Sequence, residues 1–399
     1  METNGNTSGI KPGVRRCLAA SLLGGMVFMA ATTSLQGSLL NEIIAHYSLT
    51  DSAQGLASSL SALGSVTALI ISFLLIGKVR KMTLLKIAFA IVTAGLGAMV
   101  LQPAFGAFIL LWAVIGFGMG LIDTLLSACM SDLYSGKAAT RMMCFLHMTF
   151  GLSNMATPVL VSRLLAGGLQ WHAVYPIIAA FGALLILFTV SATVKAGGGS
   201  REAADISPVS FGTMRTALKR GCLPFMVLAM LVIGYYMGGM ITWTNRYIGV
   251  TLGSSLGDIG LTFLFAGVMF SRFIFPFLNI RPEKYICFGG FAAAAMLLAG
   301  ILLRSGTVTC VMFTLCGLCF GAMIPCMLNV ACESTPENTM LATTPMMLAL
   351  YIGQILGAPC IGALEASADL HVGIGSCAVM MVLSSVCCIL GIRRARRKG

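Results

Sequence analysis

One carboxyl group lies inside an apolar stretch of the sequence, where an acidic residue is not expected. Asp123 follows the glycines at 116, 118 and 120 and is the one acidic residue well inside an apolar run. A charge within hydrocarbon is costly, so an intramembrane carboxyl marks a functional site by default. Such a carboxyl can take up and release a proton as its surroundings alternate. The alternative is a structural aspartate that is held by hydrogen bonds.

A histidine is expected at a similar depth to this carboxyl. His147 lies about six residues, and Asp123 about eight residues, from the same end of their respective apolar runs, so at about 1.5 Å of rise per residue their depths agree to about 3 Å. Neighbouring antiparallel helices would let the two side chains titrate as a coupled pair for proton transfer. The alternative is a lone histidine that is hydrogen-bonded to backbone or water.

Further polar groups stand in other apolar runs. Arg272 would bind an anionic group, gate a pathway, extend its charge to the membrane interface, or serve structure alone. Uncharged hydrogen-bonding groups and an aromatic ring are typical of a site for a polyhydroxy ligand, although they suit any hydrated transport cavity. The candidate cavity residues are Gln36, Asn154, Trp243 and Gln354.

The elements that must position these groups are membrane-spanning helices. Of the 399 residues, 58% are hydrophobic and 10% are charged, against roughly 25% charged in soluble domains. A spanning helix needs about 20 mostly apolar residues. Windows of that length predict an all-α polytopic membrane protein with twelve helices, near residues 18–40, 55–77, 82–102, 107–131, 141–166, 172–195, 221–245, 257–280, 284–303, 307–331, 341–365 and 371–392.

The basic residues predict the orientation of these helices. With the N-terminus inside, 21 of the 25 Lys and Arg residues fall in cytoplasmic segments, and only Arg163, Arg246 and Arg304 fall outside. Positive charge is retained on the cytoplasmic side, so both termini are expected there. The net charge of +12 is thus a topology signal, and no stretch resembles a nucleic-acid-binding domain.

The chain divides near its middle. Residues 196–220 have the glycine-rich, charged composition of a linker, so we expect an N-terminal six-helix bundle at 1–195, a cytoplasmic linker at 196–220 and a C-terminal six-helix bundle at 221–399. The halves resemble each other at a constant offset, since Gly116, Pro158 and Arg80 each recur 201 positions later (317 − 116 = 201). Such parallel repeats are typical of transporters that hold their substrate near the bilayer midplane, between the halves.

On these residues the chain resembles the major facilitator superfamily, and more narrowly its fucose permease branch of sugar and proton symporters. Segment 118–124, GMGLIDT, is similar to that branch's fourth helix, whose carboxyl is implicated in proton coupling and matches Asp123. Segment 146–151, LHMTFG, and the residues Trp243, Tyr247 and Arg272 are also similar.

The chain departs from this family pattern at two places. The loop after the second helix carries Arg80, which is a gating candidate beside Arg272, but Gly77 stands where the family usually has an aspartate. Gln36 and Gly37 stand near the position of the branch's first-helix carboxyl. The resemblance also implies a bacterial inner membrane.

These patterns predict a secondary transporter that moves a small polar solute, such as a sugar, by alternating access with proton symport. The alternative is a proton-driven exporter of amphipathic compounds. No enzyme is expected, because the four histidines lie in separate segments and no catalytic motif is present. No cofactor or metal site is expected, and Cys316 and Cys319 are interpreted as packing residues. The expected partners are the solute, a co-transported proton and the lipid bilayer, without nucleic acid, and the protein is expected to act as a monomer.

Overall fold

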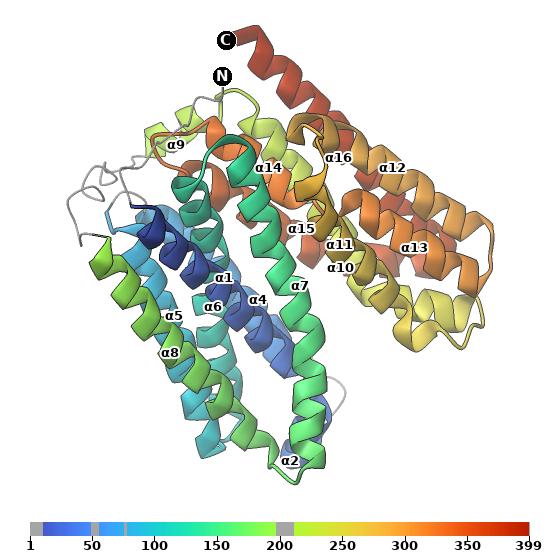
Figure 1. Ribbon diagram of the computed structural model, residues 1–399. Helices are drawn as coiled ribbons and strands as arrows, with labels where there is room; N and C mark the ends of the chain where they lie inside the picture. Colours follow the sequence, from blue (N-terminus) through green and yellow to red (C-terminus); the bar gives the residue numbers. More distant parts are fainter. Residues whose placement is uncertain (1–10, 49–55, 76–77, 197–210, 399) are drawn as a thin grey trace. The chain divides into compact units, whose positions relative to one another are not determined.

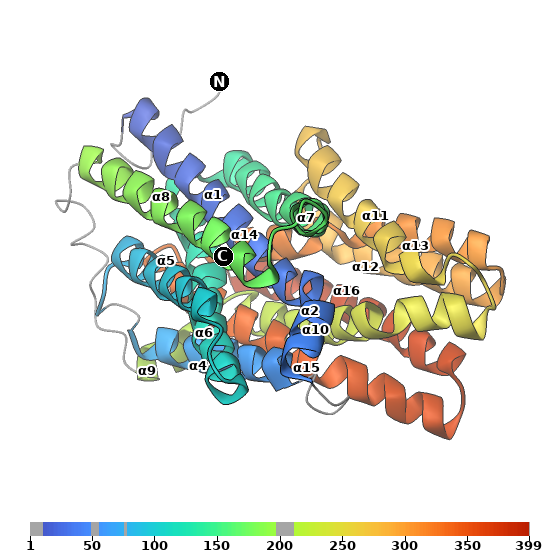
Figure 2. The ribbon, with the colours of Figure 1, turned by 90° about the horizontal axis from the view of Figure 1, so that it is seen from below.

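The computed structural model describes residues 11–48, 56–75, 78–196 and 211–398. Throughout these ranges the chain is built from helices (Figures 1 and 2). The helices are α1 (Pro12–Ser38), α2 (Leu40–Tyr47), α4 (Leu56–Leu75), α5 (Lys81–Ala98), α6 (Phe105–Leu133), α7 (Gly136–Ala166), α8 (Val174–Lys195), α9 (Phe211–Ala217), α10 (Leu223–Arg246), α11 (Gly260–Ile274), α12 (Pro282–Leu302), α13 (Gly306–Phe320), α14 (Met323–Glu333), α15 (Met340–Ser367) and α16 (Leu370–Lys398).

The helices have the length and composition of membrane spans. Among the described residues, eleven helical stretches are long and apolar enough to cross a bilayer, and a shorter apolar stretch, Leu63–Ser72, lies within α4. Helices suit lipid because they satisfy every backbone polar group internally. The predicted all-α polytopic fold is confirmed, and the helix count is close to the predicted twelve.

The chain forms two compact units. Unit 1 comprises Met1–Ser135 and Leu146–Val209, and unit 2 comprises Gly136–Phe145 and Ser210–Gly399. Helix α7 therefore contributes its first turns to unit 2, where the side-chain amide of Asn329 donates to the Thr140 hydroxyl at 3.0 Å. The remainder of α7 belongs to unit 1. The predicted bundle boundaries at 195 and 221 remain predictions.

The two units use the same helix contacts. Gly64 of α4 lies so close to α6 that an added Cβ would be 2.1 Å from the carbonyl oxygen of Ala113, and an added Cβ on Gly267 of α11 would be 2.0 Å from that of Thr314. Ala113 and Thr314 are 201 positions apart (314 − 113 = 201). Each glycine thus lets two backbones approach closely, and the repeat found in the sequence recurs in the packing of each unit.

Candidate functional site

Asp123 lies in the most buried part of α6. Every residue from Gly118 to Met130 is buried, and Asp123 itself is 9% exposed. Glycine permits this depth, because a Cβ on Gly120 would lie 2.6 Å from the carbonyl oxygen of Ser65 in α4. The helix thus places a carboxyl inside the packing of unit 1, where its charge has little access to solvent.

His147 is also buried, with 7% of its surface exposed. It lies on α7, two residues after that helix passes from unit 2 to unit 1. The structure therefore assigns Asp123 and His147 to one unit and buries both side chains. Their coupling as a titrating pair remains a prediction.

One cavity candidate, Asn154, lies at the contact between α1 and α7, which we call the α1–α7 seam. The Ser34 hydroxyl donates to the side-chain oxygen of Asn154 at 2.6 Å, and the Ser153 hydroxyl donates to the backbone oxygen of Val27 at 2.9 Å. Asn154 is half-buried, so hydroxyl groups hold its amide at a partly open position. Gln36 belongs to α1, but its side chain lies outside the described residues.

Two further candidates belong to the contact between α10 and α15, the α10–α15 seam. The Trp243 indole nitrogen donates to the backbone oxygen of Ala358 at 2.9 Å, which fixes the orientation of the ring. One helical turn away, the amide nitrogen of Gln354 contacts the Met237 sulfur at 3.9 Å. A thioether is a weak acceptor, so a solute hydroxyl would be a stronger partner for this amide. Trp243 and Gln354 thus belong to one seam within unit 2.

Arg272 is buried, with 7% of its surface exposed, and it is directed at a neighbouring helix. Its Nε donates to the backbone oxygen of Gly321 at 2.9 Å. Gly321 and Ala322 form a turn between α13 and α14, so the tenth span, predicted as one helix over 307–331, is in fact broken. Pro325 was the available signal in the sequence, because proline cannot donate the helical hydrogen bond to the residue four positions earlier.

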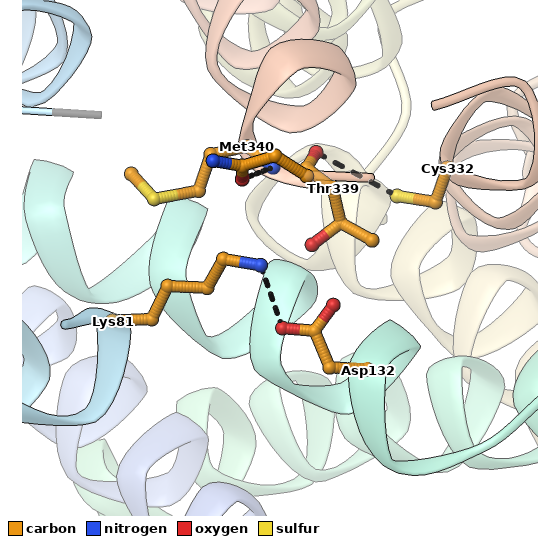
Figure 3. A network of polar contacts seen from close by, with 6 residues as sticks. Lys81, Asp132, Cys332, Thr339 and Met340 are labelled. Atoms are coloured by element: carbon orange, nitrogen blue, oxygen red, sulfur yellow. Dashed lines mark hydrogen bonds and ion pairs between the residues drawn. The ribbon is translucent and has the colours of Figure 1, made fainter. Parts of the chain in front are cut away.

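Arg80, the second gating candidate, is the half-buried N-cap residue of α5. The next residue, Lys81, places its amino group 2.7 Å from a carboxylate oxygen of Asp132 at the end of α6 (Figure 3). No local pattern links these two residues, because 51 positions separate them. The pair links α5 to α6 within unit 1.

Unit 2 uses a different acid at the corresponding position, Glu333, which follows Asp132 by 201 positions (333 − 132 = 201). The Asn329 amide donates to a Glu333 carboxylate oxygen at 3.1 Å. The Cys332 thiol, near the end of α14, is directed at the backbone oxygen of Thr339 in the segment that follows (Figure 3). The acid of unit 2 thus accepts a hydrogen bond from its own helix, whereas the acid of unit 1 pairs with a residue of another helix.

An aromatic cluster in unit 1 brings together two of the histidines that are far apart in the sequence. The rings of His46 and His172 lie 5.1 Å and 5.8 Å from that of Trp171. Aromatic residues of this kind are enriched at membrane–water interfaces. Within the described residues, no three His, Cys, Asp or Glu side chains form a group that could hold a metal ion.

Solved structures share this arrangement of helices. A crystal structure of FucP in the outward conformation superimposes with a TM-score of 0.77 at 15% identity, covering 94% of this chain and 98% of that chain. The Escherichia coli fucose:proton symporter FucP gives 0.74 at 14% identity, with 94% and 98% covered. The human organic anion transporter MFSD10 gives 0.74 at 14% identity, with 95% and 100% covered. At these identities the likeness establishes the fold.

Sequence relatives and a family model extend the comparison. A TsgA homologue from Enterobacter sp. (strain 638) is 20% identical over 252 residues, and the match spans 62% of each chain. The family model described as Major Facilitator Superfamily matches residues 22–340, which is well over half of the sequence. This protein therefore belongs to the Major Facilitator Superfamily, a family of secondary transporters rather than enzymes.

Proposed function

We propose that this protein transports a small polar solute of the sugar class together with protons, by alternating access. The observation that carries the proposal is the burial of Asp123 within the packed part of α6. An acidic residue at such a position is kept by function more often than by stability, because burying an apolar residue there costs less free energy. The fold shared with a fucose:proton symporter supports the same coupling ion and solute class.

In this proposal the Asp123 carboxyl is the proton carrier. A neutral, protonated carboxyl tolerates a buried position far better than a carboxylate does. Alternating access would expose the group to water on one side, where it takes up a proton, and then on the other side, where it releases the proton. His147, in the same unit, is the candidate partner for this transfer.

The two seams supply the groups that would bind the solute. Asn154 lies at the α1–α7 seam, Trp243 and Gln354 lie at the α10–α15 seam, and Gln36 of α1 is a further candidate. Amides both donate and accept hydrogen bonds, and an indole ring offers an apolar face to a sugar ring. Arg80 and Arg272 remain candidates for gating. Each seam is a candidate for contact with the solute within its own unit.

The protein is an integral membrane protein, and we propose that it resides in a bacterial inner membrane as a monomer with both termini in the cytoplasm. The excess of Lys and Arg in the segments at one end of the spans supports this orientation. The bacterial source of its TsgA relatives supports the compartment.

Proton flux into liposomes tests this function. The purified protein is reconstituted with a trapped pH dye, and a panel of sugars and other polar solutes is added outside. One solute is expected to acidify the interior in the wild type, while Asp123→Asn still binds that solute but gives no proton signal. Asp369→Asn is the matched control, since it makes the same chemical change at an exposed carboxyl.

The same liposomes separate this proposal from the alternative exporter. Equal solute movement in wild type and Asp123→Asn, without acidification, would show that Asp123 does not carry protons. Proton-dependent removal of an amphipathic dye, with no sugar-dependent signal, would contradict the sugar symport proposal and favour the exporter.

A further inference from the structure

The break in the tenth span is a built feature with its own hydrogen bonds. Helix α13 ends at Phe320 and α14 begins at Met323. Pro325 has no backbone N–H, so the oxygen of Gly321, four positions earlier, has lost its helical donor. Arg272 supplies a replacement from α11, because its Nε lies 2.9 Å from that oxygen. Gly321 itself is buried.

A second interruption lies one residue further along the chain. The Ala322 N–H would bond to the oxygen of Leu318 in a continuous helix. Instead it donates to Ser271 Oγ at 3.2 Å and to the Tyr285 hydroxyl at 3.4 Å. The Tyr285 hydroxyl in turn donates to the Leu318 oxygen at 3.4 Å, so this side chain is inserted into the hydrogen-bond ladder of the helix.

Close packing brings these groups to the break. A Cβ on Gly321 would lie 2.5 Å from the Val268 oxygen and 2.7 Å from Ser271 Cβ. The missing side chain lets α11 approach the turn, so that Ser271 and Arg272, adjacent on α11, reach successive backbone groups. Ser271 and Arg272 are both buried, where backbone groups without partners are costly.

The costs of the proline and of the arginine offset each other. A buried arginine is costly in a membrane protein, and so is a carbonyl without a donor; the hydrogen bond between them satisfies the carbonyl and one of the five N–H donors of the guanidinium. We infer that Arg272 is a positioning residue, which holds α14 at its angle to α13 by supplying the hydrogen bond that Pro325 removes. This role does not depend on the solute or on the coupling ion proposed above.

The inference predicts that the need for Arg272 depends on Pro325. Pro325→Ala restores an N–H that can bond the Gly321 oxygen as in an ordinary helix. We would compare wild type, Arg272→Met, Pro325→Ala and the double variant by backbone hydrogen–deuterium exchange over residues 318–329 and by thermal unfolding. In the wild-type background, Arg272→Met is expected to accelerate exchange about tenfold, and in the Pro325→Ala background the same change should have less than about a third of that effect.

Three further variants control this cycle. Arg272→Lys keeps a donor and should retain most of the protection, whereas Arg281→Met removes an exposed arginine from the same unit and should leave exchange unchanged. Tyr285→Phe removes the hydroxyl that bridges the Ala322 N–H and the Leu318 oxygen, so its effect should persist when Pro325 is replaced.

The outcomes are distinguishable even if Arg272→Met does not fold. Recovery of a folded protein on adding Pro325→Ala would support the inference. An equal acceleration of exchange by Arg272→Met in both backgrounds, or a double variant as unfolded as the single one, would show that Arg272 acts independently of the break.

Discussion

The fourth and tenth spans are repeats of each other, yet one is continuous and the other is broken. Helix α6 runs from Phe105 to Leu133 without interruption, whereas α13 and α14 are separated at Gly321–Ala322. At an offset of 201, Pro325 corresponds to Thr124, whose hydroxyl donates to the Gly120 oxygen at 3.3 Å. The same carbonyl position is therefore satisfied from within its own helix in unit 1 and from a neighbouring helix in unit 2.

The residues around the two positions differ together. Ser271 contacts Gly321 where Ala68 contacts Gly120, so Arg272, the next residue, corresponds to Leu69. Tyr285 corresponds to Leu84, since Arg281 and Arg80 are the N-cap residues of α12 and α5. Unit 1 has neither the proline nor the three polar side chains. At this position unit 2 therefore holds the proline together with its polar partners, and unit 1 holds none of them.

The largest expected effect comes from moving the proline alone into unit 1. Thr124→Pro should free the Gly120 oxygen opposite Leu69, which has no donor, at a cost of about 3 kcal/mol or more. We expect loss of the folded protein by size-exclusion chromatography and thermal unfolding. Adding Leu69→Arg should recover part of the fold. Thr124→Ala is the control, and a Thr124→Pro protein as stable as this control would contradict the comparison.

The glycine contacts test the equivalence of the repeats themselves. Gly64→Ala and Gly267→Ala each place a methyl group against a backbone oxygen, and overpacking of this kind costs about 1–3 kcal/mol. Thermal unfolding should show similar losses for the two variants. Gly375→Ala is the control, because nothing lies within 4 Å of its added Cβ. A loss confined to one of the two glycines would break the equivalence.

The smallest effect is expected at the α1–α7 seam. Hydroxyl groups make the contacts of this seam. In the α10–α15 seam, by contrast, glycines bring the backbones together, and an added Cβ on Gly238 would lie 2.2 Å from the backbone oxygen of Gln354. Ser34→Ala removes one partly buried hydrogen bond to Asn154 and should cost about 1 kcal/mol. Gly238→Ala, measured beside it by thermal unfolding, should cost more, and the reverse order would contradict the distinction between the seams.

The sequence predicted the parts of this fold that hydrophobicity alone determines. Apolar runs long enough for a bilayer become helices because lipid offers no other partner for the backbone. Asp123 was expected to be buried because apolar residues surround it in the sequence. A window of about 20 residues, however, averages over a single proline, so 307–331 was predicted as one helix.

The remaining features depend on contacts between distant residues. The partners of the break, Ser271 and Tyr285, stand 51 and 37 positions before Ala322, and no local pattern links them to it. The division of α7 between the two units at Phe145 and Leu146 likewise reflects packing rather than composition. For Asp123 and His147, the sequence predicted helices and approximate depths, while coupling depends on side-chain geometry that spacing does not determine.

The segment between the packed glycine and the next helix differs in length between the two units. Gly64 precedes Arg80 by 16 positions (80 − 64 = 16), whereas Gly267 precedes Arg281 by 14 (281 − 267 = 14). The segment from the packed glycine to the next N-cap residue therefore holds two more residues in unit 1 than in unit 2. Within a span they would have turned the remainder of the helix by about 200° and carried its contact face away from its neighbour. The two units therefore differ in the length of a connection, while the contact residues keep the same spacing within each helix.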